Sequence, residues 1–546
     1  MPLRHIPPLQ DQSRSRLESW LHVVLLVALS TYFEAQFVYV GVNATDEGWI
    51  LYAAMRLWDG GTLYDDIFFV FPPGHVLPAW IAYGLAAPGL VLSRWIYAGF
   101  NVALCVALYL LGRRITRPMY AFIAVAMVAV YSPYSHGAHF LFGYRYLVWS
   151  ILALLAFSQR LRTDDHRWMM LAGALAGIAL CFRLTPAFSV SVGIGFGILA
   201  ASRDWRLWLR DGAWYTAGLL LVAGPVLAWL FSGVGPLVVW SEAVQRAVEM
   251  TKLQAVDMPP LHFPWGWERQ EIQGALVAVV FRAAPLFYVS YIVLVLTMWA
   301  RDLRSGVDCR RPLLIAIVFF GAVYLGRGFG RADQGHLDTA MPPVLLLLGH
   351  MLGGIESRLA KAMSARAATA IVATAGVALL VVSVAGQRSD DWMFSPAPPR
   401  VPIKAVQGRI KRWIYNNKTD PAVAMIKRST RATDTILDLS ASPLFSVLSG
   451  RRGPGYADIV MPGTFRDAAE ESRFVERLRA DPPAFVLEPK TPFDAVSANA
   501  LALTAPELTV WIEDNYGRGP ETPHFVGRPR RPQPLSAQSD LSSDTE

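Results

Sequence analysis

Long apolar segments separated by short connections fill residues 20–386, and residues 1–386 are the expected transmembrane domain. A helix that crosses the hydrocarbon core of a bilayer needs about 20 mostly apolar residues. Only helices and closed barrels satisfy all their backbone hydrogen bonds in lipid, and these segments are far too long for barrel strands. The sequence therefore predicts an all-α polytopic membrane bundle with about eleven transmembrane helices. The expected spans are residues 20–40, 94–112, 119–134, 146–161, 168–182, 185–201, 213–233, 281–299, 312–327, 337–353 and 367–386.

Basic residues gather in every second connection between these segments. Connections rich in Lys and Arg face the cytoplasm, so we expect a cytoplasmic N-terminus in an inner (plasma) membrane protein. An odd number of spans then places the C-terminal part of the chain on the extracytoplasmic side. The same distribution accounts for the net charge of +8, so no nucleic-acid partner is expected. The basic connections hold Arg14 and Arg16; Arg113, Arg114 and Arg117; Arg160, Arg162 and Arg167; Arg203, Arg206 and Arg210; Arg301, Arg304, Arg310 and Arg311; and Arg358, Lys361 and Arg366.

The chain from residue 387 onward is polar and Pro-rich and holds no apolar segment long enough to span a membrane. Strand-like runs at 435–439 and 484–488 lie on either side of an amphipathic helical stretch. Alternating strands and helices predict a small α/β domain, which we place at residues 387–520 as a soluble extracytoplasmic domain. Pro, Arg, Ser and Asp dominate residues 521–546, which predicts a disordered tail.

Two of the expected outer connections are unusually long. The first, residues 41–93, ends in a Pro-interrupted apolar stretch, Gly74–Leu92, which we expect to lie along the membrane surface as a juxtamembrane helix. The second, residues 234–280, holds a helical stretch, Leu237–Lys252, with one apolar and one polar side. That pattern is typical of a helix that lies in the plane of the membrane interface.

Two adjacent carboxylates, Asp46 and Glu47, follow the first apolar segment. A carboxylate in a partly desolvated place can act as a general base toward a hydroxyl group. The structural alternative is a solvated turn in which Asp46 caps a helix that begins near Trp49. A second acidic pair, Asp65 and Asp66, is less informative because such pairs are common in turns.

An ordered set of short motifs extends over residues 43–80: Asp-Glu-Gly, Tyr-Ala, Asp-Gly-Gly-x-x-Tyr-Asp-Asp and Pro-Pro-Gly. Together they resemble the first outer loop of the family-39-like glycosyltransferases, which have the GT-C fold. This group includes protein O-mannosyltransferases and the transferases that add aminoarabinose or other sugars to lipopolysaccharide. The expected topology is similar as well, with the active loop and a soluble C-terminal domain outside.

The resemblance implies a membrane glycosyltransferase that moves a sugar from a polyprenyl-phosphate carrier to an acceptor hydroxyl on the extracytoplasmic side, with inversion. The acceptor would be a glycan, a lipid or a protein of the cell envelope. An acidic residue of the first outer loop is essential in the family. This implies that the loop at residues 41–93 is catalytic, with Asp46 as the base and Glu47 orienting it or the acceptor. The lysine-rich signatures of aminoarabinose enzymes and the repeated modules of eukaryotic mannosyltransferases are not evident, so the acceptor stays open.

In the family, a basic residue near the outer end of a later helix contacts the lipid phosphate. Arg183, which ends the apolar stretch Gly173–Arg183, is similar to that pattern. Arginine suits a phosphate because its planar fork can donate two hydrogen bonds at once. The alternative is an arginine whose head group only reaches the outer lipid headgroups.

A second group of charged residues lies between Gly326 and Asp338, in one short outer connection. Such a density of charge beside the membrane indicates recognition of the donor phosphate or sugar, although a solvated loop would also explain it. Similar Arg-x-Asp-x-x-His loops occur in some bacterial members of the family. The candidate donor-binding residues are Arg327, Arg331, Asp333 and His336. Asp65, Asp66 and Arg145 are kept as acceptor-binding or structural residues.

Two histidines, His136 and His139, have no persuasive metal spacing with any carboxylate, so no metal site is assigned. No cofactor is certain, and a divalent metal is left open. The rival interpretation is a polytopic transporter or a lipid-linked-sugar flippase, in which buried charges line a pathway. A non-catalytic assembly subunit with the same fold is a third interpretation. The charges gather on one side and no inverted repeat of broken helices is evident, which favours the enzyme.

Overall fold

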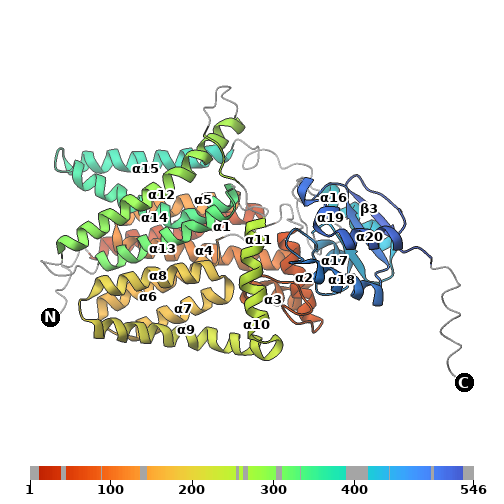
Figure 1. The fold of residues 1–546 in the computed structure, drawn as a ribbon. Coiled ribbons are helices and arrows are strands. Elements are labelled where there is room, and N and C mark those ends of the chain that lie inside the picture. Colours follow the sequence, from red (N-terminus) through yellow and green to blue (C-terminus); the bar gives the residue numbers. More distant parts are fainter. Residues whose placement is uncertain are drawn as a thin grey trace, which may run out of the picture.

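Every predicted span coincides with a helix in the computed structural model (Figure 1). The structure describes residues 12–38, 45–87, 89–135, 144–253, 257–261, 269–302, 310–332, 334–388, 416–441, 443–492 and 497–532. The helices that match the predicted spans are α1 (Gln12–Phe37), α4 (Leu90–Ile115), α5 (Pro118–Ser135), α6 (Leu147–Thr163), α7 (Arg167–Phe182), α8 (Leu184–Ala201), α9 (Trp205–Val234), α12 (Arg269–Asp302), α13 (Arg310–Gly330), α14 (Gln334–Leu359) and α15 (Ala365–Arg388). The predicted helical bundle is therefore confirmed.

Among the described residues, 5 helices are long and apolar enough to cross a membrane by length and composition, and they lie in α4, α8, α9, α12 and α13. Shorter apolar helices lie in α5, α7 and α15. Two further helices, α1 and α6, carry buried charged residues, among them Glu34 and Arg160, which lower their average hydropathy. The chain is thus a multi-pass membrane protein, and the number of its crossings stays a prediction.

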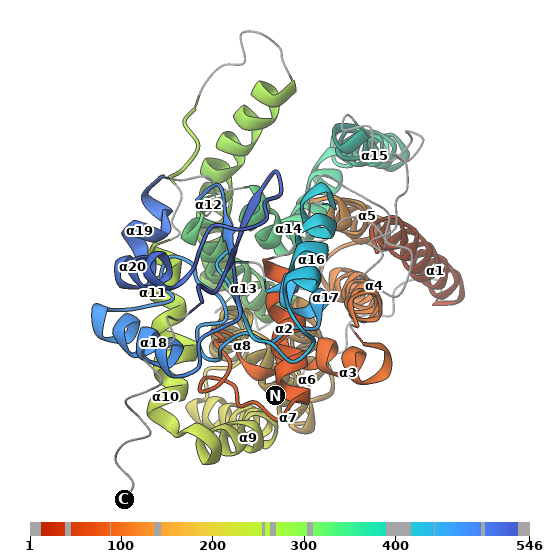
Figure 2. The ribbon, with the colours of Figure 1, turned by 90° about the vertical axis from the view of Figure 1, so that its right-hand side faces the viewer.

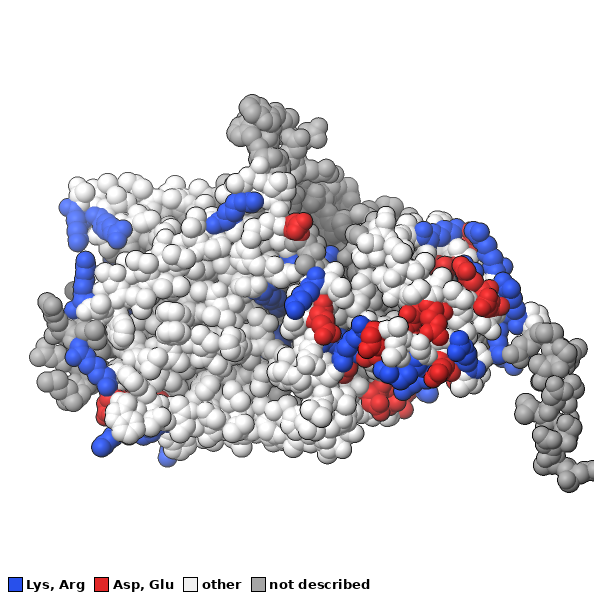
Figure 3. Space-filling view, in the orientation of Figure 1, with Lys and Arg blue, Asp and Glu red and all other residues white. Residues whose placement is uncertain are grey.

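Residues that were predicted on the same side of the membrane contact one another in the structure. Arg160 Nε lies 3.1 Å from Asp211 Oδ1, and Arg117 Nη1 lies 2.5 Å from Glu356 Oε1. All four belong to expected cytoplasmic ends. Figure 3 shows Lys and Arg at the end of the bundle away from the C-terminal domain, and few charged side chains along the face between them. The arrangement fits a bilayer around the bundle, while its sidedness stays a prediction.

Single surface cysteines are expected to report this sidedness. In a cysteine-free background, an impermeant thiol reagent applied to intact cells should label Asp65→Cys and Val510→Cys but not Arg206→Cys. All three positions are exposed, so labelling depends on the side of the membrane and not on burial. Labelling of Arg206→Cys in intact cells, with Asp65→Cys protected, would contradict the predicted orientation.

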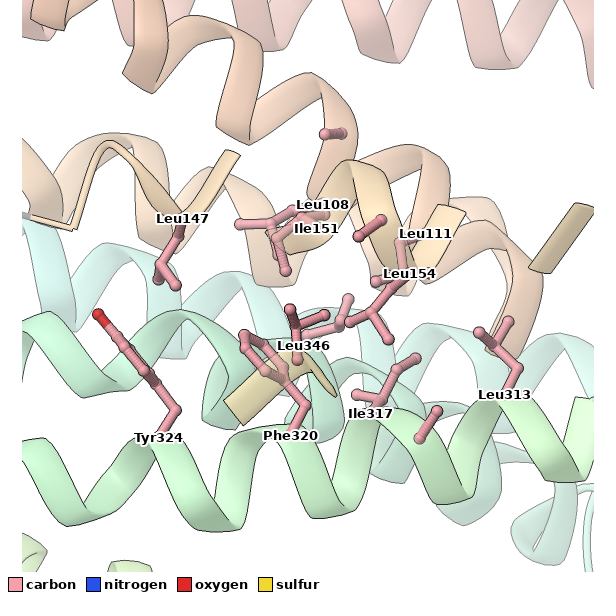
Figure 4. Close-up of a cluster of buried hydrophobic side chains, with 14 of the residues drawn as sticks. Leu108, Leu111, Leu147, Ile151, Leu154, Leu313, Ile317, Phe320, Tyr324 and Leu346 are labelled. Carbon is pink, nitrogen blue, oxygen red and sulfur yellow. The ribbon is translucent and has the colours of Figure 1, made fainter. Parts of the chain in front are cut away.

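The backbones of α7 and α9 touch through glycines. A Cβ atom on Gly173 would lie 1.8 Å from the carbonyl oxygen of Tyr215, and one on Gly218 would lie 1.9 Å from that of Met170. Close approach at small residues is typical of helix pairs in membranes. Elsewhere in the bundle, leucine, isoleucine and aromatic side chains fill the interior (Figure 4). The tight pair fixes α7 against α9, and Arg183 follows α7 directly.

The C-terminal part of the chain forms the predicted small α/β domain. Within its described residues, its sheet has 3 strands in the order β1-β2-β3. Strand β1 (Ile436–Asp438) is parallel to β2 (Phe485–Pro489), and β3 (Phe525–Pro529) is antiparallel to β2. The two predicted strands are thus confirmed. The helices of the domain are α16 (Asn416–Ser429), α17 (Leu444–Ser449), α18 (Ala468–Ala480), α19 (Leu501–Thr504) and α20 (Pro506–Asn515).

The prediction of a disordered tail over residues 521–546 is wrong for its first part. Strand β3 lies within this range and pairs along its length with β2. Its side chains Phe525 and Val526 are buried, which stabilises the strand. Composition predicts disorder here because so short an apolar pair is outweighed by the surrounding Pro and Arg. Residues 533–546 lie outside the described part of the chain.

The two long connections that are expected outside, which we continue to call the outer connections, fold into short helices between the bundle and the C-terminal domain (Figures 1 and 2). A juxtamembrane helix was predicted over Gly74–Leu92. The observed helix is shorter and covers Leu77–Ala86. The first connection holds α2 (Asp46–Trp58), a 3₁₀ turn (Pro73–His75) and α3 (Leu77–Ala86). The second holds α10 (Pro236–Trp240), a π-helical turn (Ser241–Arg246) and α11 (Ala247–Leu253), which together we call the strap.

A buried arginine of the strap, Arg246, joins it to the C-terminal domain. Its guanidinium pairs with Glu242 at 2.5 Å and with Glu470 at 3.0 Å. It also donates to the carbonyl oxygen of Thr464 at 2.6 Å, and its carbon lies 5.4 Å from the ring centroid of Phe68 in the first outer connection. These polar groups of the strap thus face protein, while an apolar side made up of Leu237, Trp240, Val248 and Leu253 stays exposed. Contact of that apolar side with the membrane interface stays a prediction.

The C-terminal domain rests directly on the first turn of α2. A Cβ atom on Gly48 would lie 2.6 Å from the backbone nitrogen of Leu444, which begins α17. Farther along α2, Arg56 Nη1 lies 3.0 Å from Asp458 Oδ2. Buried apolar side chains of α2, α16, α17 and the sheet form one cluster. The helix that carries the candidate base is therefore held in place by the C-terminal domain.

Gly48→Ala is expected to destabilise the protein by about 1–3 kcal/mol, as overpacking substitutions do. The added methyl group would meet backbone atoms, which cannot rotate away as a side chain can. Gly99→Ala is the control, because a Cβ there has open space around it and alanine is the better helix former. Thermal unfolding of the purified proteins in detergent compares them. Equal melting temperatures for the two variants would contradict the close contact.

Candidate active site

Helix α2 begins at Asp46, with Thr45 as its N-cap and no capping hydrogen bond from the Thr45 side chain. The structural alternative, in which Asp46 itself caps a helix that begins near Trp49, is therefore wrong. A carboxylate in the first turn of a helix is favoured by the helix dipole. Asp46 is half-buried, so its carboxylate is in part accessible at this end of the bundle.

Glu47, the neighbouring carboxylate, is locked in a double ion pair with Arg94 of α4. Arg94 donates from Nε to Oε1 at 2.8 Å and from Nη2 to Oε2 at 2.6 Å, and neither side chain is exposed. Arg94 also donates to the carbonyl oxygen of Val38 at 2.9 Å. Both oxygens of the Glu47 carboxylate are thus occupied by the guanidinium group of Arg94. The geometry suits Glu47 for holding α2 against α4, and an orienting role stays a prediction.

Arg183 lies in extended conformation between α7 and α8, with φ −158° and ψ 135°. Its guanidinium carbon is 4.2 Å from the ring centroid of Phe71 in the first outer connection. Its Nε donates a hydrogen bond to Tyr146 Oη at 3.2 Å. The side chain is thus turned toward the loop that holds Phe71 and is half-buried, whereas the snorkelling alternative requires a side chain that extends away from the protein.

Arg327 comes from the last turn of α13 and reaches the same tyrosine. Its Nη1 donates to Tyr146 Oη and, at 3.4 Å, to Tyr324 Oη. Within the described residues, Arg327 has no carboxylate at ion-pair distance. Two guanidinium groups therefore converge on one phenol oxygen. Such a concentration of positive charge in a partly buried place favours the binding of an anion.

His75, from the Pro-Pro-Gly-His turn, completes this cluster. Its ring centroid lies 5.1 Å from that of Phe71 and 5.7 Å from that of Tyr146. Burial, together with the positive charges of Arg183 and Arg327, lowers the pKa of His75 well below its usual range. The imidazole is therefore neutral at physiological pH and adds no charge to the site.

No protein-family model matches the chain, and no curated protein sequence matches it. Several solved structures share its architecture. ArnT from Cupriavidus metallidurans, bound to undecaprenyl phosphate, gives a TM-score of 0.52 at 13% identity, over 93% of this chain and 97% of ArnT. The oligosaccharyltransferase of Archaeoglobus fulgidus, tethered to an acceptor peptide, gives 0.52 at 13% identity, over 94% of this chain and 75% of that enzyme. Its complex with Zn and sulfate gives 0.53 at 14% identity, over 92% and 72%. The chain has the GT-C fold.

The GT-C bundle places Arg145 in a buried ion pair beside Tyr146. Arg145 Nη2 lies 3.1 Å from both carboxylate oxygens of Glu34 in α1. Asn101 of α4 donates to the same carboxylate at 2.7 Å. Arg145 therefore holds the segment that carries Tyr146 against α1 and α4. An acceptor-binding role for Arg145 stays a prediction.

The other charged residues of the α13–α14 connection lie beyond Arg327. Arg331 follows the end of α13 and is half-buried, and His336 lies in the first turn of α14. Asp338, two positions further along α14, is buried. Asp333 lies outside the described residues. Their roles in donor recognition stay predictions.

Asp65 and Asp66 are exposed in a turn of the first outer connection. The carboxylate of Asp66 accepts the backbone N–H of Thr62 at 3.0 Å, and its carbonyl oxygen accepts that of Tyr456 at 2.9 Å. These bonds close the turn and join it to the C-terminal domain. An acceptor-binding role for either carboxylate stays a prediction.

Among the residues that the structure describes, no group of His, Cys, Asp and Glu could hold a metal ion. His136 and His139 lie outside those residues. The metal requirement therefore stays open.

Several residues of the site were not found from the sequence. Tyr146, Phe71 and His75 carry no formal charge at neutral pH, and they adjoin the arginines only in the folded chain. Glu34 and Arg94 could have been identified from the sequence, because an ionisable residue within an apolar segment needs a partner. The structure supplies those partners as Arg145 and Glu47.

Proposed function

We propose that the chain is a membrane glycosyltransferase that moves a sugar from a polyprenyl-phosphate carrier to an acceptor hydroxyl. The reaction takes place on the extracytoplasmic side and inverts the anomeric carbon. The observation that carries the proposal is the convergence of Arg183 and Arg327 on Tyr146, beside the loop that bears Asp46. The GT-C fold supports it, and ArnT, which has this fold, was solved bound to undecaprenyl phosphate.

The two arginines are proposed to bind the donor phosphate. A phosphate oxygen would take the place that the Tyr146 hydroxyl occupies between the guanidinium groups, through charge-assisted hydrogen bonds. As the bond between the anomeric carbon and the phosphate oxygen breaks, negative charge grows on the leaving polyprenyl phosphate. Guanidinium groups already aimed at that position stabilise the charge without rearrangement. The lipid carrier supplies the activated sugar, so no nucleotide is needed at the site.

Asp46 is proposed to take the proton of the acceptor hydroxyl as its oxygen attacks the anomeric carbon. The new carbon–oxygen bond forms while the bond to phosphate breaks, and its electron pair leaves with the phosphate. A single displacement of this kind inverts the anomeric centre. Asp46 belongs to the first turn of α2, which is held in place by the ion pair of Glu47 with Arg94 and by the C-terminal domain. A fixed position of this kind fits the precision that general-base catalysis needs.

The proposal is tested with purified protein in lipid nanodiscs that contain a polyprenyl-phosphate sugar. Release of polyprenyl phosphate that depends on an added acceptor is the expected result, and repeating the assay with EDTA settles the metal requirement. Candidate acceptors come from comparing the envelope glycans of cells with and without the protein. Movement of the intact donor across vesicle membranes, with no release of polyprenyl phosphate, would instead support the flippase interpretation.

A further inference from the structure

The guanidinium group of Arg183 lies against the aromatic ring of Phe71. The distance of 4.2 Å from the guanidinium carbon to the centroid of Phe71 is well inside the range of about 6 Å for cation–π contacts. The Nε atom is bonded at the same time to Tyr146 Oη. The arginine is therefore held between one ring and one hydroxyl, in a single orientation.

Phe71 is itself fixed from several sides. Its carbonyl oxygen accepts a hydrogen bond from Tyr64 Oη at 2.6 Å. Its ring centroid lies 5.4 Å from that of Trp49 and 5.6 Å from that of Phe69, and His75 lies on a further side at 5.1 Å. A ring surrounded in this way has little freedom to move, so Phe71 is a rigid platform.

The turn after Phe71 is docked on the end of α7. A Cβ atom on Gly74 would lie 2.6 Å from the carbonyl oxygen of Cys181, and Arg183 follows Cys181 by two positions. Only glycine permits so close an approach of the two backbones. The Pro-Pro-Gly turn therefore fixes Phe71 and Arg183 relative to each other.

We infer that Phe71 is a positioning residue for the donor phosphate, which rests on the donor-binding role proposed for Arg183. Stacking uses the face of the guanidinium group and leaves its in-plane N–H groups to make hydrogen bonds. An arginine that is already oriented loses less conformational freedom when an anion binds. Phe71 thus prepares Arg183 for bidentate contact with phosphate.

The same ring connects the arginine to the proposed base. Trp49 lies on the first turn of α2, three positions after Asp46, and contacts Phe71. Ring contacts therefore run from α2 through Phe71 to the guanidinium group. A displaced Phe71 would disturb the distance between the base and the leaving group as well as the phosphate contact.

Phe69 provides the matched control. It belongs to the same loop, is fully buried, and contacts the rings of Trp49 and Phe71. Phe69→Leu removes at least as much buried ring as Phe71→Leu, because Phe71 is only half-buried, but it leaves the ring that contacts Arg183. If Phe71 acted only through packing, the two substitutions would have the same effect on ligand binding.

The experiment measures the binding of undecaprenyl phosphate to the purified full-length protein in nanodiscs, with uncharged undecaprenol as the reference lipid. Phe71→Leu is expected to raise the dissociation constant for the phosphate lipid by about tenfold. Phe71→Tyr keeps an aromatic face and should bind nearly as the wild type does. Phe69→Leu should keep its affinity even where its melting temperature falls as far as that of Phe71→Leu.

Phe71→Met, which conserves more volume, replaces Phe71→Leu if the latter does not fold, with the same expectation. Wild-type affinity in the folded Phe71 variant, while Arg183→Ala has lost affinity, would overturn the positioning role alone. An equal loss in Phe69→Leu would do the same. Equal affinity of the wild type for undecaprenyl phosphate and undecaprenol would instead overturn the proposed phosphate site, and the inference with it.

Discussion

Replacing Asp46 with asparagine is expected to slow sugar transfer by about a hundredfold to ten-thousandfold, the usual cost of losing a general base. Asparagine preserves the size of the side chain and can still accept a hydrogen bond, but it cannot take the proton of the acceptor hydroxyl. The initial rate with saturating donor and acceptor measures the effect. Because Thr45, and not Asp46, is the N-cap of α2, the substitution leaves the cap of the helix in place.

A purely structural role for Asp46 predicts a very different result. Loss of its charge from the first turn of α2 would cost about 0.3–1 kcal/mol through the helix dipole. The melting temperature would then shift slightly and the transfer rate would stay close to that of the wild type. A wild-type rate of sugar transfer in the purified Asp46→Asn variant would therefore show that Asp46 is not the base.

The structure also decides which control is useful. Glu47→Gln breaks a fully buried ion pair with Arg94, and loss of one partner of such a pair typically costs about 3–5 kcal/mol. A loss of activity in that variant would therefore report unfolding as readily as chemistry. Asp514→Asn is the better control, because Asp514 is an exposed carboxylate of the C-terminal domain with no assigned role in binding or catalysis. It should keep its stability, and its transfer rate should exceed that of Asp46→Asn by at least tenfold.

The helical bundle could be predicted from the sequence because its signal is local. A helix in lipid satisfies its own backbone hydrogen bonds, so a long apolar segment by itself specifies the element. A short strand gives a weaker signal, since it depends on its neighbour: β1 and β2 could be predicted from their apolar runs, but β3 could not. Phe525 and Val526 stand among Pro and Arg, and only pairing with β2 makes this segment a strand. The predicted disorder failed there for that reason.

Some residues of the candidate site could likewise be predicted from the sequence, and others could not. Arg183 and Arg327 could be found from the sequence because each is a charged residue at the end of an apolar helix. A charge in such a place is costly unless it has a partner or a function. Their shared partner Tyr146 could not, because it is separated by 181 positions from Arg327 and by 37 from Arg183. Phe71 likewise reads as an ordinary apolar residue until the folded chain places its ring against a guanidinium group.

Arg183→Ala is expected to lower kcat/KM for the polyprenyl-phosphate sugar by about a hundredfold to a thousandfold, the range for loss of one preorganised charge-stabilising group. The loss should appear at low donor concentration, because the guanidinium group is proposed to bind the phosphate in the ground state and in the transition state. Arg183→Lys should retain part of the activity, since the charge survives while the planar fork and its stacking on Phe71 are lost. Steady-state kinetics over a range of donor concentrations measures both variants.

A buried arginine at the opposite end of the bundle separates the loss of a phosphate contact from a general loss of stability. Arg160 is bonded to Asp164 and Asp211 and lies far along α6 from the Tyr146 end of that helix. Arg160→Ala should lower the melting temperature at least as much as Arg183→Ala, yet the folded fraction should keep the wild-type KM for the donor. Arg183→Ala with normal turnover at low donor concentration would contradict the phosphate role. So would an equal rise in donor KM in both variants, because a group remote from the phosphate can raise KM only through disturbance of the whole bundle.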